Sequence, residues 1–185
     1  MRLPRGLGAV GGLVATVLVA LAGTAAALPG PKLEATRALG VQGTENAAFP
    51  LGSGPPLRQV RYVDRKELVY RIVVRNDSRL PVTVTGVEDG DTSRAHPLLR
   101  VVGLQPGDVR IGAGQARELD IRVLMTNCEY VSPRSGTVVD RVRVHVRRLG
   151  ALPDTVTLRL PERLRTGSPR DEQCPHPEQD TRSPG

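Results

Sequence analysis

The stretch YRIVVRNDSRLPVTVTGV, from Tyr70 to Val87, contains two runs of alternating apolar residues on either side of a polar bend. A period of two with many β-branched residues is the pattern of β-strands whose two faces meet different surroundings. The bend NDSRLP at 76–81 suits a turn, because Asn and Asp bond their own backbone and Pro81 can begin a strand without an amide donor. The stretch therefore predicts two neighbouring strands joined across a bend.

The same alternation recurs along the chain, separated by polar or Gly- and Pro-containing turns, and no stretch has a convincing helical period. The expected strands are residues 57–62, 67–75, 82–87, 98–104, 116–125, 137–148 and 154–161. About seven short strands with turns between them predict an all-β fold, an immunoglobulin-like (Ig-like) antiparallel β-sandwich over residues 57–165.

Several of these segments also carry a family resemblance. The opening stretch, LQPGDVRIGAGQARELDIRVLMTNCEY at 104–130, DTVTLRLP at 154–161 and CP at 174–175 resemble uncharacterised exported actinobacterial proteins. In that family a signal or anchor segment precedes an Ig-like β-sandwich domain. The resemblance implies a fold and an extracytoplasmic location, and it implies no activity.

Residues 1–27 have the composition of an export signal. A basic start is followed by an uncharged stretch that ends in Ala25-Ala26-Ala27, the small-residue pattern read by signal peptidase. An uncleaved anchor helix is the alternative, since residues 6–27 are long enough to cross about 30 Å of hydrocarbon. We therefore expect a secreted or extracytoplasmic protein, either free or tethered to the cytoplasmic membrane.

The segments that flank the expected sandwich are rich in Pro and Gly. Residues 28–56 show no sustained period, which predicts a flexible linker that contacts the domain at Phe49 and Leu51. Residues 166–185 form a Pro-rich tail. Because an exported chain with two cysteines usually pairs them, we expect a disulfide between Cys128 and Cys174 that pins this tail.

The charge of the chain is concentrated in arginine. The formal net charge is +7, and only Lys32 and Lys66 are lysines. A basic stripe, defined as Arg141, Arg143, His145 and Arg147 with Arg148 beside it, alternates with apolar residues in segment 137–148. Its functional interpretation is a binding surface for an anionic polymer or lipid headgroups. Its alternative is a solvated strand whose charges prevent edge pairing, with Glu118, Asp120 and Glu162 as neutralising acids.

Other kinds of site find little support in the sequence. The metal-ligand types His96, His145, His176, Cys128, Cys174 and Met125 lack the spacing of a copper or zinc site. The acidic turn with Glu88, Asp89 and Asp91 lacks the spacing of a calcium loop. No nucleophile motif is present, which argues against an enzyme, and no cofactor is expected. With no Trp and four other aromatics, the chain lacks the stacking platforms of nucleic-acid binders.

These observations predict a non-enzymatic exported Ig-like domain that acts as a binding or structural module of the cell envelope or extracellular space. The expected partner is a protein or an anionic envelope component and not a nucleic acid. Contact with the membrane is expected only through residues 6–27, if these are uncleaved. The alternative is a small envelope metal-binding or redox carrier.

Overall fold

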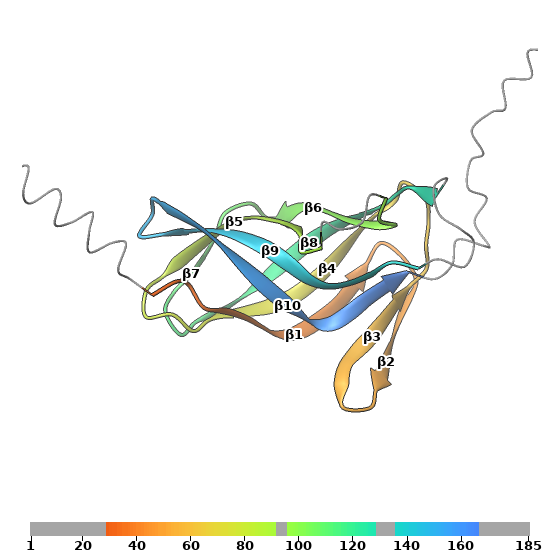
Figure 1. Cartoon of the computed structure of the whole chain (residues 1–185), viewed down its shortest axis with the longest axis horizontal. Helices are drawn as coiled ribbons and strands as arrows, with labels where there is room; N and C mark the ends of the chain where they lie inside the picture. Colours follow the sequence, from red (N-terminus) through yellow and green to blue (C-terminus); the bar gives the residue numbers. More distant parts are fainter. Residues whose placement is uncertain (1–28, 92–95, 129–135, 167–185) are drawn as a thin grey trace, which may run out of the picture. The chain divides into compact units, whose positions relative to one another are not determined.

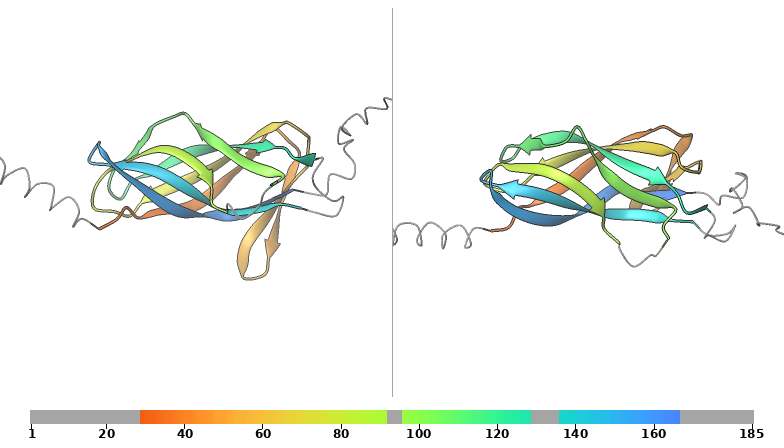
Figure 2. Two further views of the ribbon diagram at one scale, coloured as in Figure 1. Left: turned by 45° about the horizontal axis from the view of Figure 1, so that its top comes forward. Right: turned by 90° about the horizontal axis from the view of Figure 1, so that it is seen from above.

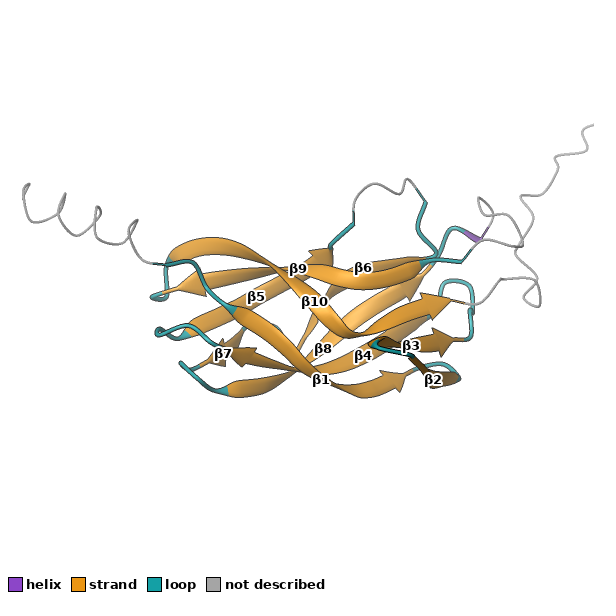
Figure 3. Ribbon diagram, turned by 60° about the horizontal axis from the view of Figure 1, so that its bottom comes forward, coloured by secondary structure: helices purple, strands orange, loops and turns teal. Residues whose placement is uncertain are grey.

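The computed structural model describes residues 29–91, 96–128 and 136–166 of the 185-residue chain. The chain divides into two compact units at Gly30 and Pro31, and the described residues lie almost entirely in the second unit. The strands are β1 (Leu33–Gln42), β2 (Asn46–Leu51), β3 (Gly54–Val60), β4 (Glu67–Asn76), β5 (Val82–Asp89), β6 (Leu99–Gln105), β7 (Val109–Ile111), β8 (Ala116–Met125), β9 (Val138–Arg148) and β10 (Leu152–Thr166). No α-helix occurs in this part of the chain, and the short piece drawn as helix in Figure 3 is a 3₁₀ residue at Cys128.

The strands form two layers (Figures 1 and 2). One sheet has the order β1-β4-β8-β6 and the other the order β2-β3-β10-β9-β5-β7. Neighbouring strands pair antiparallel, except that β10 pairs with β3 in parallel through residues 163–166 and 57–60. The expected all-β sandwich is confirmed, with three strands and one parallel pair beyond the expectation.

The core lies between the two sheets and consists of alternate residues of the strands. In β4, Leu68, Tyr70, Ile72 and Val74 are all at most 1% exposed, while the residues between them are less buried. The inward residues of β5, β8 and β9 follow the same rule, and most of them are Val, Leu or Ile. The alternation in the sequence therefore identified the core-facing positions correctly.

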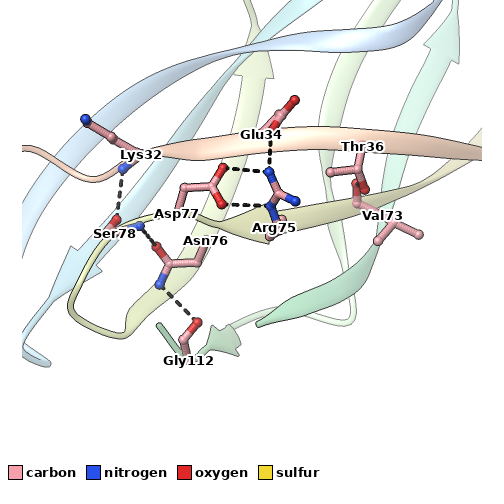
Figure 4. Close-up of polar contacts among 9 residues, drawn as sticks. All are labelled: Lys32, Glu34, Thr36, Val73, Arg75, Asn76, Asp77, Ser78 and Gly112. Atoms are coloured by element: carbon pink, nitrogen blue, oxygen red, sulfur yellow. Dashed lines mark hydrogen bonds and ion pairs between the residues drawn. The ribbon is translucent and has the colours of Figure 1, made fainter. Parts of the chain in front are cut away.

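The expected pairing of the two strands within Tyr70–Val87 is wrong. Strand β4 belongs to the four-stranded sheet and β5 to the six-stranded sheet, so the bend carries the chain from one layer to the other. Asn76, which is fully buried, fixes this crossing (Figure 4). Its Nδ2 donates to the carbonyls of Leu80, Ile111 and Gly112 at 2.9, 3.1 and 3.2 Å, and its Oδ1 accepts from the Ser78 amide at 3.0 Å. A period of two predicts strands, but it cannot tell a hairpin from a crossing between sheets.

The expected linker at residues 28–56 is also wrong, because it contains β1, β2 and the start of β3. Strand β1 pairs with β4 over its whole length, and its inward residues include the small side chains Ala35 and Ala38. Two register shifts in this pairing interrupt the alternation, so the sequence shows no regular period there. Within the described ranges, no helix is long and apolar enough to span a membrane. The expected signal or anchor, residues 1–27, lies outside these ranges.

Candidate binding surface

The hairpin of β2 and β3 projects away from the two packed sheets (Figures 1 and 2). Its base is held by Asn46, whose Nδ2 donates to the carbonyls of Val41 and Thr44, both at 3.0 Å. Gly43 in the preceding turn has a φ of +98°, and a Cβ there would lie 2.8 Å from the Glu67 carbonyl oxygen. The turn between β1 and β2 therefore requires glycine, which sets the direction in which the hairpin leaves the sandwich.

A largely buried ion pair connects the hairpin to β10. The Arg58 guanidinium donates to Glu162 through Nε at 2.5 Å and Nη2 at 3.0 Å, and through Nη1 to Asn46 Oδ1 at 2.8 Å. The bond to Glu162 raises the pKa of Arg58 above its ordinary value. The Tyr70 hydroxyl approaches the Glu162 carbonyl oxygen at 3.5 Å, and burial is the main cause that raises the pKa of Tyr70. Because this bidentate pair is only about 15% exposed on each side, it orients the hairpin firmly.

The register of β2, β3 and β10 assigns their side chains to two faces. Val60, Leu164 and Thr166 are buried, so the face that carries them is turned toward the core. The other face carries Phe49, which is opposite Leu57, and Leu57 is in turn opposite Arg163. Directly opposed residues share a face, and this face is therefore the outer one.

We call this outer surface the hairpin patch. It consists of Ala47, Phe49, Leu51, Leu57, Arg163 and Arg165. Phe49, the only phenylalanine of the chain, is 50% exposed, and Leu51 is 37% exposed. The expected packing of Phe49 and Leu51 against the domain is therefore not what the structure has. No residue from 46 to 57 carries a charge, although 24% of the whole chain is charged.

Two arginines border the apolar part of the hairpin patch. Arg163 and Arg165 lie opposite Leu57 and Gln59 in the parallel pairing of β10 with β3. Neither arginine forms an ion pair with any residue that the structure describes, and the Nε of Arg163 is buried without a hydrogen-bond partner there. The hairpin patch thus combines exposed apolar side chains with two arginines that no acid of the described ranges neutralises.

The basic stripe lies elsewhere on the same sheet, on the outer side of β9. The alternation is as expected, since Val142, Val144 and Val146 are buried and the stripe residues between them are not. Its neutralising acids are different from those expected, because Asp120 pairs with Arg71 and Glu162 with Arg58. Each member faces an acid instead, in the pairs Arg141–Asp140, Arg143–Glu88, His145–Glu88, Arg147–Asp108 and Arg148–Asp154.

Strand position explains why the stripe is neutralised. Strand β9 lies between β10 and β5, so its charges do not protect a sheet edge, as the alternative interpretation required. Glu88 of β5 lies directly opposite Arg143 and their side chains approach to 3.0 Å. An open groove of about 500 Å³ runs beside His145 and Arg147, with Asp154 also in its wall. This surface presents mixed charge, and binding of an anionic polymer to it remains a prediction.

Two carboxylates of the expected acidic turn, Glu88 and Asp89, are the last residues of β5, and they point to different partners. Asp89 Oδ1 accepts from the amide of Val101 at 2.9 Å, which links β5 to the edge strand β6 of the other sheet. Burial raises the pKa of Asp89 despite that hydrogen bond. Glu88 faces the stripe. In the described ranges, no group of three or more His, Cys, Asp or Glu side chains could hold a metal ion.

The remaining candidate ligands are spread through the molecule. Met125 is fully buried and its sulfur accepts from the Val63 amide at 3.4 Å, whereas His145 is on the outer surface. Cys128 is buried at 2% exposure. Its expected partner Cys174 and the tail that the disulfide would pin lie beyond residue 166, outside the described ranges, as does His176. The disulfide therefore remains a prediction.

The comparisons with known proteins give no family. No family model and no curated protein matches the chain. Among solved structures, the E. coli chaperone DraB matches 76% of this chain with 17% identity and a TM-score of 0.38, and the putative ApaA protein of Bordetella pertussis matches 77% with 15% identity and a TM-score of 0.39. A PapD-like domain of human CEP192 matches 68% with 11% identity and a TM-score of 0.31.

The matched parts of those chains differ in extent. The chain spans 56% of DraB, 98% of the ApaA protein and 86% of the CEP192 domain. At these TM-scores the likeness carries no conclusion about function or partner.

Proposed function

We propose that this protein is an exported Ig-like β-sandwich that acts without catalysis as a binding module of the cell envelope, and that it docks through the hairpin patch. One observation carries the proposal: Phe49 and Leu51 are exposed on a projecting hairpin whose residues 46–57 are uncharged. Exposed apolar residues gathered in one place mark interaction sites more often than isolated ones do. The rigid anchoring of the hairpin by Arg58 and Glu162 supports the same conclusion, since a pre-ordered surface loses less entropy on binding.

The export half of the proposal is supported by the signal pattern in residues 1–27. The resemblance to exported actinobacterial proteins agrees with it. The envelope is the compartment in which an exported module with an apolar and cationic surface meets both membranes and anionic polymers.

The test is co-sedimentation of the purified full chain with isolated cell envelopes. A double variant, Phe49→Ser with Leu51→Ser, should reduce the bound fraction at least about tenfold, because it removes the apolar contact area. Leu149→Ser is the matched control, since Leu149 is 54% exposed but lies in the turn between β9 and β10. Equal binding of the wild type and the double variant, or loss of binding in the control, would contradict the proposal.

A further inference from the structure

The hairpin patch has a shape and chemistry that favour one kind of partner. We propose that the hairpin patch docks on an anionic phospholipid surface, with Phe49 and Leu51 inserted at the interface and Arg163 and Arg165 against the headgroups. This inference depends on the proposed function and names the partner of the same surface. It adds a second membrane contact to the one expected through residues 6–27.

The shape of the hairpin favours a lipid surface over a protein. The hairpin projects from the sandwich and leaves Phe49 and Leu51 at 50% and 37% exposure on it. A protein partner would have to supply a fitted pocket for such a projection, whereas a lipid interface accepts an apolar projection of any outline. Aromatic and aliphatic side chains gain free energy when they enter the boundary between headgroups and acyl chains.

The backbone of β2 is poorly suited to pairing with a strand of a partner protein. The strand is an edge of the six-stranded sheet, and an edge strand can recruit a further strand from a partner protein. Pro50 has no amide donor, and the pairing with β3 has a register shift between Phe49 and Leu51. Both features oppose the addition of a strand, so β2 offers its side chains and not its backbone to a partner.

The charge beside the apolar residues also favours an anionic surface. Arg163 and Arg165 share the outer face with Leu57 and Gln59 and have no acid partner in the described ranges. The stripe arginines Arg143 and Arg147 are also partly exposed, but they face Glu88 and Asp108. Among the described residues, positive charge is thus left without an acid partner next to the apolar residues, which is the combination that an anionic bilayer surface attracts.

The absence of tryptophan from the chain makes a direct experiment possible. A Phe49→Trp variant carries a single tryptophan, and it lies on the hairpin. With vesicles of phosphatidylglycerol and phosphatidylcholine, its emission should shift to the blue and become protected from iodide quenching. Val102→Trp is the matched control, because Val102 is 37% exposed on β6 of the other sheet. The emission of this control variant should stay unchanged.

Charge variants test whether Arg163 and Arg165 contact the lipid headgroups. Arg163→Gln and Arg165→Gln should each weaken co-sedimentation with anionic vesicles about fivefold, and high salt should weaken binding of the wild type. The double variant Arg143→Gln with Arg147→Gln should bind as the wild type does. Circular dichroism of each variant establishes that the sandwich has folded.

The possible results separate this inference from the proposed function. Binding to isolated envelopes, without any emission shift of the Phe49→Trp variant on vesicles, would overturn the lipid inference and indicate a protein or polymer partner at the same surface. An equal shift in the Phe49→Trp and Val102→Trp variants, or a loss of vesicle binding only in the stripe variant, would overturn it as well. Failure to bind both envelopes and vesicles would overturn the proposed function itself.

Discussion

Replacing Asn76 by alanine should destabilise the sandwich far more than removing the neighbouring Ser78 hydroxyl. The Asn76 side chain is fully buried and its amide serves the carbonyls of three residues from two separate segments, with Ser78 bonded in return. A buried polar group that loses its partner costs about 1–3 kcal/mol. Some of the carbonyls can relax toward water, so we expect a loss of about 3–5 kcal/mol, a large part of a typical domain's stability of about 5–15 kcal/mol.

Equilibrium unfolding in urea measures this loss. With a slope of about 2 kcal/mol/M, the midpoint of the Asn76→Ala variant should fall by about 2 M. Ser78→Ala is the control, because it removes only the exposed bond from the Lys32 amide at 2.9 Å (Figure 4) and should cost less than about 1 kcal/mol. If the two variants lost equal stability, or if Asn76→Ala lost less than about 1 kcal/mol, the role assigned to the crossing between the sheets would be refuted.

Three further predictions concern separate parts of the molecule. Burial raises the pKa of Asp89 in the folded state, so its contribution to stability is present below its unfolded pKa and is lost as pH rises through the folded pKa. The unfolding free energy of the wild type minus that of Asp89→Asn, measured in urea, should therefore decrease from about pH 3 to pH 7. A difference that does not change with pH would contradict this. Gly43→Ala should cost about 1–3 kcal/mol because its Cβ would meet the Glu67 carbonyl in a left-handed conformation, whereas Gly107→Ala, with open space around it, should stay within about 0.5 kcal/mol in the same assay. Intact mass of the native protein should show a species that starts near Leu28, whose two cysteines react with an alkylating agent only after reduction; free thiols before reduction would exclude the disulfide of Cys128 and Cys174.

The sequence identified the strands that have a regular period and large side chains. Strands β4, β8 and β9 have almost the bounds that alternation predicts, because a buried face and a solvated face impose a period of two. Strand β1 was not predicted, because its inward residues include alanines and its bulges shift the period of the alternation. Which strands become neighbours was not predictable for β4 and β5, since pairing is decided by long-range contacts such as those of Asn76 with Ile111 and Gly112.

The candidate surface was missed for a related reason. Residues 46–57 contain Pro, Gly and Ala without a period, which is also the composition of a linker. The hairpin is attached to β10 through the ion pair of Arg58 with Glu162, which is 104 residues away along the chain. The absence of charge from 46 to 57 was the one local indication of a binding surface. It points to such a surface only once both faces of β2 are known to be largely exposed.

The two groups of arginines show that the fold, and not the net charge, decides which surface is left positively charged. Taken alone, a charge of +7 and a stripe of four basic residues point to β9 as the anionic docking surface. In the folded chain, β9 lies beside β5 and β10, and both neighbours bring acids within reach of the stripe. At the hairpin, Leu57 and Gln59 lie opposite Arg163 and Arg165, and no acid in the described part of the chain pairs with either arginine, so their charge is not neutralised there. Substitutions at the hairpin should therefore weaken the binding of an anionic partner, and substitutions in the stripe should leave it unchanged. The sequence alone predicts the opposite.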